Sequence, residues 1–182
     1  KLFPKTIYEN EYATVGVINE KTENETLKVV EITPYRLESA YSDLRRPDSV
    51  AFSAKLEDDL KRRDFTINAI ALEIGERGGV SGLYKGHLVD LYKGQNDLVD
   101  KTVRTVGDPH DRFSEDALRI LRAIRISTEL GFVIEAETAG AIEKYASLLK
   151  EIAQERIRDE FIRIIMSDNP MIGVKLKKKL GV

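Results

Sequence analysis

The sequence predicts an α+β fold, with strands in roughly the first hundred residues and helices after about residue 105. Short, apolar and β-branched segments occur near the N-terminus, and a glycine-rich stretch follows at 75–90, as is typical of strands joined by turns. Beyond residue 105, capping residues and apolar residues at helical spacing alternate instead. With 182 residues, 42% of them hydrophobic, the chain is long enough to bury a core.

Two strands are expected near the N-terminus, over residues 14–19 (TVGVIN) and 27–33 (LKVVEIT). The polar segment 20–26 between them is expected to be a hairpin loop, and Pro34 ends the second strand. Residues 36–50 are polar and without clear periodicity, which predicts a loop.

Apolar spacing predicts two short helices within residues 55–74, meeting near residues 63–64. The apolar residues that set this spacing are Leu56, Leu60, Ile67, Ile70 and Ala71. Asp64 or Thr66 is expected to cap the second helix. The glycines that follow indicate a turn-rich hairpin over 75–90.

The second half of the chain predicts an all-helical arrangement. Asp111 or Ser114 can cap a helix that runs to Leu130, where Gly131 provides a typical stop. Two further helices are expected over residues 136–149 and 153–167, with Asn169–Pro170 as the break after them.

Composition excludes several classes of site. The chain has no cysteine, which removes disulfides, thiolate catalysis and cysteine-bound zinc, and its two histidines are too few for a multi-histidine metal site. A net charge of −2 gives no overall basic signal for nucleic acid. No apolar run approaches the roughly 18 residues of a membrane span, so no membrane partner is expected. Without cysteines or an export signal, a cytoplasmic location is expected.

The first chemically informative cluster is Arg62-Arg63-Asp64-Phe65-Thr66-Ile67-Asn68, at a predicted helix start. Arginine offers fork-shaped donors for phosphate, and a helix N-terminus adds aligned N–H groups for an anion. Asp64 and Asn68 could hold ribose hydroxyls. The alternative is a surface helix with a salt-bridged cap.

The second cluster begins with Glu115 and places Asp116 and Arg119 three residues apart on one predicted helix, with Arg122 one turn further. A carboxylate beside a guanidinium can match the Watson–Crick edge of a base, because the carboxylate accepts from an exocyclic amine while the guanidinium donates to a ring nitrogen or carbonyl. The alternative is a Glu115–Arg119 ion pair on a solvated helix face.

The third cluster centres on Glu31 in the segment VVEIT, with charged residues after it at Arg36, Asp43, Arg45 and Arg46. A single carboxylate does not make a two-metal site, which needs at least two clustered carboxylates. The other acidic run, 57–59, is interpreted as a solvated helix face.

These clusters, in this order, resemble the class II tRNA nucleotidyltransferases, which include the CCA-adding enzymes, and the related bacterial poly(A) polymerases. The resemblance covers nearly the whole chain, and five motifs in the correct order make it specific. The matching segments are 41–52 (YSDLRRPDSVAF), 59–72 (DLKRRDFTINAIAL), 90–98 (DLYKGQNDL), 104–125 (RTVGDPHDRFSEDALRILRAIR) and 155–161 (ERIRDEF).

The resemblance implies a role for each matching residue. Arg63 and Asp64 would contact the ribose and triphosphate of the incoming nucleotide, supported by Arg62 and Asn68. Glu31 would be the third acidic residue of the active site, a catalytic Mg²⁺ ligand whose partners are absent from this chain. The base would pair with Asp116 and Arg119, and Arg122 is assigned to the same nucleotide site. The head–neck link would consist of Gly107, Asp108, Arg112 and Phe113.

The resemblance also implies an architecture and a reaction. A partial nucleotidyltransferase head would cover 1–104, a helical neck with the nucleotide template 105–150, and the start of a helical body 151–182. The intact enzyme would transfer CMP and AMP from CTP and ATP to the tRNA 3′ end, with Mg²⁺, releasing pyrophosphate. The family's upstream Gly-Gly and D-x-D segment and its C-terminal tail have no counterpart here, so the chain is expected to be an internal piece, inactive by itself.

Two alternatives stay open. A bacterial poly(A) polymerase or an A-adding enzyme would share these motifs, whereas the intact stretch 36–50 argues against an enzyme that adds only CC, because those members resemble the family with this loop shortened. A non-catalytic nucleotide- or RNA-binding fragment is the alternative from another class. The sequence does not indicate an oligomeric state.

Overall fold

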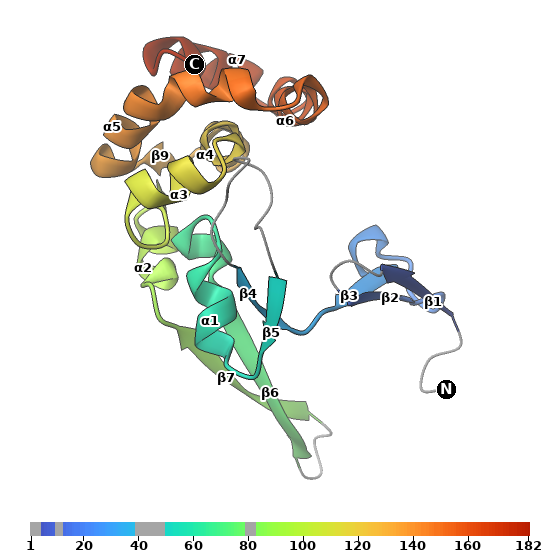
Figure 1. Cartoon of the computed structure of the whole chain (residues 1–182). Helices are drawn as coiled ribbons and strands as arrows, with labels where there is room; N and C mark the ends of the chain where they lie inside the picture. Colours follow the sequence, from blue (N-terminus) through green and yellow to red (C-terminus); the bar gives the residue numbers. More distant parts are fainter. Residues whose placement is uncertain (1–4, 10–12, 39–49, 79–82) are drawn as a thin grey trace.

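The structure, a computed structural model, describes residues 5–9, 13–38, 50–78 and 83–182, and it is an α+β fold as predicted (Figure 1). The helices α3 to α7 gather at one end, with β9 among them, and the strands β1 to β7 lie at the other end and to one side. Within the described ranges, no helix is both long and apolar enough to cross a membrane.

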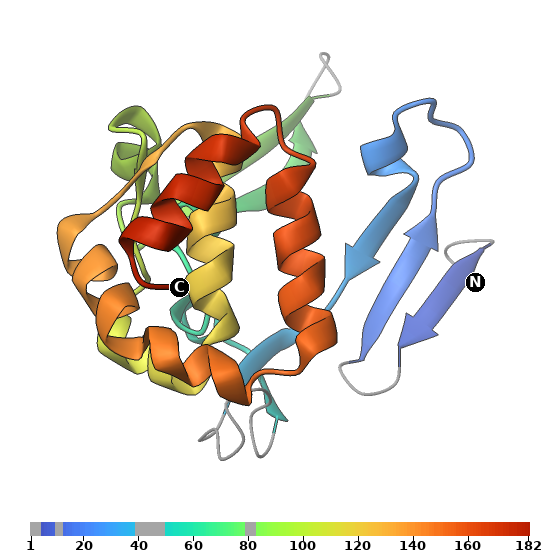
Figure 2. The ribbon, with the colours of Figure 1, turned by 90° about the horizontal axis from the view of Figure 1, so that it is seen from above.

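The strands form small antiparallel sheets and one short parallel pair. They are β1 (Thr6–Glu9), β2 (Thr14–Ile18), β3 (Val29–Ile32), β4 (Tyr35–Glu38), β5 (Val50–Ser53), β6 (Ile70–Gly78), β7 (Leu83–Asp90), β8 (Thr102–Val103) and β9 (Val133–Ile134). The sheet β1-β2-β3 stands apart from the helices in both overall views (Figures 1 and 2). In its register Val15 lies opposite Ile32 and Val17 opposite Val30, which confirms the two expected strands and adds β1 at the edge.

The helical part packs around one central helix. The helices are α1 (Leu56–Lys61), α2 (Gly94–Val99), α3 (Pro109–Glu115), α4 (Leu118–Leu130), α5 (Ala136–Tyr145), α6 (Gln154–Ile165) and α7 (Pro170–Lys179), with 3₁₀ turns η1 (Glu25–Leu27), η2 (Thr66–Asn68) and η3 (Ala146–Glu151). Helix α4 contributes more buried residues to the core than any other element, and α6 and α7 lie against it (Figure 2). Gly131 has a φ of +66° and ends α4, as predicted.

The structure corrects two expectations in the first half of the chain. The second helix expected before residue 74 is only the turn η2, because the chain then enters β6, whose residues Ile70–Ile74 pair with Asp90–Gly86 of β7. Tertiary pairing here overrides a spacing that also suits a helix. Part of the expected loop 36–50 is strand β4, paired with β5.

The long helix expected to run to Leu130 is broken. Asp116, with φ −145° and ψ 102°, is extended and separates α3 from α4. The cap of α3 is Asp108, whose side chain accepts from the backbone N–H of His110 at 2.8 Å, and not Asp111 or Ser114 as expected. The break changes the geometry of the second cluster, because Asp116 and Arg119 do not share one helix.

Close packing of α7 on its neighbours gives a stability prediction. A Cβ added at Gly173 would lie 2.5 Å from Cγ2 of Ile164 and 2.7 Å from Oγ1 of Thr128, too close for any real contact. We expect Gly173→Ala to lower the free energy of unfolding by about 1–3 kcal/mol, the usual cost of overpacking. Chemical denaturation measures it. Gly140→Ala on α5 is the control, since nothing lies within 4 Å of its added Cβ, and it should be neutral or stabilising; equal effects of both changes would contradict the packing argument.

Candidate functional site

The segment that carries the first cluster packs directly on the helical part. Phe65 is fully buried in the core that contains Phe113 and Ile120. On either side of it, the backbone N–H of Thr66 donates to Arg104 O at 2.9 Å, and that of Val106 donates to Asp64 O at 3.0 Å. The polar residues 62–64 are thereby fixed against α3 and α4.

A polar cavity of about 570 Å³ opens between these elements and α6. Its lining contains all seven residues predicted to bind a nucleotide, although they come from segments far apart in the sequence. The lining residues are Thr33, Arg36, Arg62, Arg63, Asp64, Asn68, Asp116, Leu118, Arg119, Arg122 and Arg156. Six arginines against two aspartates make this cavity, which we call the arginine pocket, suited to an anion.

One buried carboxylate holds two of these arginines. Asp59 is 3% exposed, and its oxygens pair with Arg62 Nη2 at 2.8 Å and Arg63 Nη2 at 3.0 Å. Burial by itself raises the pKa of Asp59, but Arg62 and Arg63 outweigh it and keep the pKa below its usual value. The interpretation of 57–59 as a solvated face is therefore wrong for Asp59, although Glu57 is exposed.

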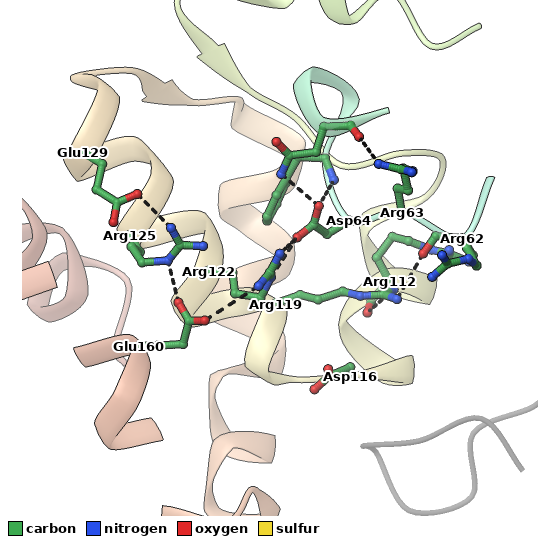
Figure 3. Close-up of polar contacts among 12 residues, drawn as sticks. Arg62, Arg63, Asp64, Arg112, Asp116, Arg119, Arg122, Arg125, Glu129 and Glu160 are labelled. Atoms are coloured by element: carbon green, nitrogen blue, oxygen red, sulfur yellow. Dashed lines mark hydrogen bonds and ion pairs between the residues drawn. The ribbon is translucent and has the colours of Figure 1, made fainter. Parts of the chain in front are cut away.

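Asp64 is also buried, and its acceptors are fully used (Figure 3). Oδ1 accepts from Phe65 N at 2.8 Å and Asn68 Nδ2 at 3.1 Å, while Oδ2 accepts from Arg122 Nε at 2.8 Å and Nη2 at 2.6 Å. Burial by itself raises the pKa of Asp64. Arg122 and these hydrogen bonds lower the pKa by more than burial raises it, so the pKa lies below its usual value. A carboxylate has about four acceptor positions, so this geometry does not support direct contact of Asp64 with a ribose hydroxyl. It orients Asn68 and Arg122 instead.

Beyond Asp64, a chain of charges leads to α6. Arg122 also lies 3.7 Å from Glu160 Oε1, and Glu160 Oε2 accepts from Arg125 Nε at 2.6 Å. Arg125 in turn pairs with Glu129 at 2.7 Å (Figure 3). Glu160 is 6% exposed, so this face of α6 is buried against α4 and supports the wall of the arginine pocket.

Asp116 keeps spare acceptor capacity. At the break between α3 and α4, its Oδ1 accepts from Leu118 N at 3.0 Å, and its Oδ2 accepts from Arg156 Nη2 at 2.9 Å. Two of about four acceptor positions are therefore used, and the residue lines the arginine pocket. Asp116 can accept from a donor group of a ligand.

Arg119 offers donors on the same side of the pocket. Its Nη1 donates to Glu115 Oε2 at 2.7 Å and to Arg112 O at 3.3 Å, and its Nη2 donates to Arg62 O at 3.3 Å. The alternative ion pair with Glu115 is thus present, yet the face is not solvated, because Arg119 is 8% exposed. Five N–H donors and three hydrogen bonds leave two donors for a ligand.

The predicted link residues lie where the two parts meet. Gly107 has a φ of +70° just before the cap Asp108, and Phe113 is fully buried in the core. Arg112 Nη1 donates to Lys61 O at 3.2 Å. Arg112 and Arg119 together hold the C-terminal end of α1, which carries Arg62.

Glu31 lies outside the arginine pocket. It is exposed on β3, opposite Gly16 of β2, while Thr33 two residues later lines the pocket. Among the residues the structure describes, no group of three or more acidic or histidine side chains could hold a metal ion. Asp43, Arg45 and Arg46 lie outside the described residues, as does most of the segment 41–52.

Sequence reasoning missed two residues that shape the pocket. Asp59 precedes Arg62 and Arg63 by three and four residues, a helical spacing that could have predicted the ion pairs. Arg156 lies forty residues from its partner Asp116, and no local pattern connects the two.

Comparison with known protein families matches both parts of the chain. Residues 1–104 match the family described as "Poly A polymerase head domain". Residues 131–182 match "Probable RNA and SrmB- binding site of polymerase A". The first match covers more than half of the chain.

Bacterial CCA-adding enzymes are similar in sequence over most of this chain. It is 42% identical to the CCA-adding enzyme of Ligilactobacillus salivarius (strain UCC118) over 176 residues, which are 96% of this chain and 40% of the relative. It is 43% identical to the CCA-adding enzyme of Enterococcus faecalis (strain ATCC 700802 / V583) over 164 residues, 90% of this chain and 36% of the relative. The chain thus spans about two fifths of the length of these proteins.

Solved structures give the same result. The Bacillus stearothermophilus CCA-adding enzyme in complex with CTP aligns over 97% of this chain and 39% of its own, with a TM-score of 0.79 and 33% identity. A tRNA nucleotidyltransferase complexed with a primer tRNA and an incoming ATP analog aligns over 97% of this chain and 45% of its own, with a TM-score of 0.74 and 27% identity. These matches confirm the fold class and the family resemblance that the sequence motifs predicted.

Proposed function

The chain belongs to the family of the poly(A) polymerase head domain, and we propose that its arginine pocket selects CTP and ATP for an RNA nucleotidyltransferase that adds CMP and AMP to tRNA 3′ ends. The observation that carries the proposal is the arrangement of Asp116 and Arg119, which present unused acceptors and unused donors to one pocket. The named relatives and the bound molecules of the similar structures support it.

The chemistry of the bases explains the selection. Cytosine and adenine both present an exocyclic amine, a donor, beside an unprotonated ring nitrogen, an acceptor. Asp116 can accept from the amine while Arg119 donates to the ring nitrogen. Uracil and guanine present the reverse order, a carbonyl beside a ring N–H, so both contacts would be mismatched.

The remaining arginines suit the triphosphate. Arg62 and Arg63 are held by Asp59, and Arg122 is held by Asp64 and Glu160, so their guanidinium groups are oriented before a ligand arrives. Preorganised charge of this kind lowers the cost of binding. In the proposed reaction, the 3′ hydroxyl of the RNA attacks the α-phosphorus, its proton is lost, and pyrophosphate leaves.

The described residues do not fit a two-metal centre. Glu31 is exposed and stands outside the arginine pocket, and no acidic cluster joins it in the part of the chain that the structure describes. Mg²⁺ is therefore proposed as a requirement of a longer protein with further carboxylates, and none of the roles above passes through it. A cytoplasmic location and the division at 104/105 and 150/151 stay predictions.

The activity is tested with a chimera in which this chain replaces the matching segment of the Ligilactobacillus salivarius enzyme. With a tRNA that lacks its 3′ CCA, labelled nucleotides and Mg²⁺, we expect the chimera to incorporate CMP and AMP but not UMP or GMP. The parent enzyme is the positive control. A folded chimera that adds no nucleotide, or that adds all four equally, would contradict the proposed function.

Binding without catalysis is the second candidate for this chain by itself. It is favoured by the pocket, whose lining contains all seven predicted nucleotide-binding residues, and by the lack of an acidic cluster for a metal ion among the described residues. In the same assay, the 182-residue chain alone should add no nucleotide. Turnover by it would mean that a metal site has been missed.

A further inference from the structure

We propose that Arg156, on α6, is a positioning residue that holds the Asp116 carboxylate in its base-reading orientation and thereby sets the preference of the pocket for cytosine over uracil. The proposal rests on the proposed function, because it explains how one of the two base-reading groups is kept in place. Arg156 would act through Asp116, without contact to the base.

Asp116 needs such support because of its place in the fold. It is extended, at the break between α3 and α4, where its backbone is held by hydrogen bonds from Asp116 N to Arg112 O at 3.4 Å and from Arg119 N to Asp116 O at 3.1 Å, but these bonds do not orient its carboxylate. Its side chain is held by two hydrogen bonds, one from Leu118 N at 3.0 Å and one from Arg156 Nη2 at 2.9 Å. The first fixes one oxygen near the backbone of α4, and the second fixes the rotation of the carboxylate group.

The environment of Arg156 favours a functional role over a structural one. Its side chain is 23% exposed, and both Arg156 and Asp116 line the arginine pocket. Within the described part of the chain, its Nη1 is buried and has no hydrogen-bond partner. A buried donor without a partner lowers the stability of the fold, so the conformation of the Arg156 side chain is not optimal for stability.

The same face of α6 serves a second residue of the pocket. Glu160 lies one helical turn after Arg156 and faces Arg122 and Arg125. This face of α6 therefore pairs each of two charged pocket residues with a residue of opposite charge. Arg156 pairs with Asp116, and Glu160 pairs with Arg122. This complementarity supports a role of α6 in orienting the site.

Arg156→Met tests the proposal, because methionine keeps much of the length of the side chain and removes the donors. We measure the affinities of CTP and UTP for the 182-residue chain by calorimetry. The ratio of the two affinities should fall by about 5- to 10-fold relative to the wild type, because a freely rotating carboxylate no longer distinguishes an amine from a carbonyl. Arg156→Lys retains the positive charge and an N–H donor group, so its ratio of CTP to UTP affinity should lie between those of the wild type and Arg156→Met.

The matched control is Arg158→Met, on the same helix, where the side chain is 65% exposed and pairs with Asp159 at 3.4 Å. It should leave the ratio unchanged. In an Asp116→Asn background, Arg156→Met should have no further effect on the ratio, because its effect passes through the carboxylate.

The outcomes separate the two proposals. A wild-type chain that binds CTP and UTP equally overturns both. A wild-type chain that prefers CTP, with Arg156→Met and Arg156→Lys keeping the full preference, overturns only the role of Arg156. Equal weakening of both nucleotides in these variants would likewise show that Arg156 supports the fold and not the choice of base.

Discussion

Asp64→Asn should lower the free energy of unfolding of the chain by about 3 kcal/mol, since removing one partner of a buried ion pair is strongly destabilising, and Arg122 would keep only its longer contact of 3.7 Å with Glu160. Asp64 is 9% exposed and accepts four hydrogen bonds, two of them from Arg122. The value is at the lower end of the usual range because the Arg122 side chain is 34% exposed. In a domain of this size the melting temperature should fall by about 6–12 °C.

The dependence of this stability loss on pH shows whether the charge of the Asp64 carboxylate is its cause. The folded-state pKa of Asp64 lies below its ordinary value of 3.8, so its contribution to stability is present above that value and is lost as the pH falls through the folded-state pKa. The difference in stability between wild type and Asp64→Asn should therefore narrow below about pH 4. Denaturation at pH 7 and at pH 3 to 4 measures it. Asp100→Asn is the control, since Asp100 is exposed, and a loss of the same size there would contradict the argument.

The residues of the pocket were predictable because their chemistry is encoded locally. Two arginines followed by an aspartate and an asparagine, and an aspartate three residues before an arginine, suit phosphate and base recognition, and the family resemblance favoured this hypothesis over a salt-bridged cap and a solvated ion pair. The end of α4 was predictable for a similar reason, because Gly131 adopts a backbone conformation that few other residues accept.

The geometry of the pocket was not predictable, because it depends on contacts between distant segments. The break at Asp116 interrupts a segment whose apolar spacing suits one continuous helix, and the partner of that residue is Arg156, on another helix. Asp59 was predicted to lie on a solvated helix face, whereas it is 3% exposed and accepts hydrogen bonds from the backbone N–H of Arg36 and the side chain of Arg62. Similarly, no local pattern predicts that Arg122, on α4, donates to Oδ2 of Asp64.

Asp116→Asn should remove most of the base preference while leaving the fold intact. The side-chain oxygen of asparagine can accept from Leu118 N as the carboxylate does, so this contact can be kept. Its amide can turn a donor toward the base, which suits the carbonyl of uracil or guanine instead of an amine. Losing a hydrogen bond to a charged acceptor costs about 1.5–3 kcal/mol, so the preference for CTP over UTP should fall by roughly 10- to 100-fold.

The control for this substitution is Asp111→Asn, an equivalent change at an exposed position of α3. Its affinities should match those of the wild type. If Asp116→Asn and Asp111→Asn both retain the wild-type preference, Asp116 serves only the structure, through its contacts with Leu118 N and Arg156.

The most direct test of a pocket that reads the amine edge of a base is to titrate the 182-residue chain with the four nucleoside triphosphates. CTP and UTP form one matched pair and ATP and GTP the other, because each pair shares its ring system and its triphosphate and differs mainly at the edge that Asp116 and Arg119 would face. The account predicts that CTP binds at least tenfold more tightly than UTP and ATP more tightly than GTP, and that Asp116→Asn removes both differences. Equal affinities within each pair for the wild-type chain, or no binding of any of the four, would contradict it.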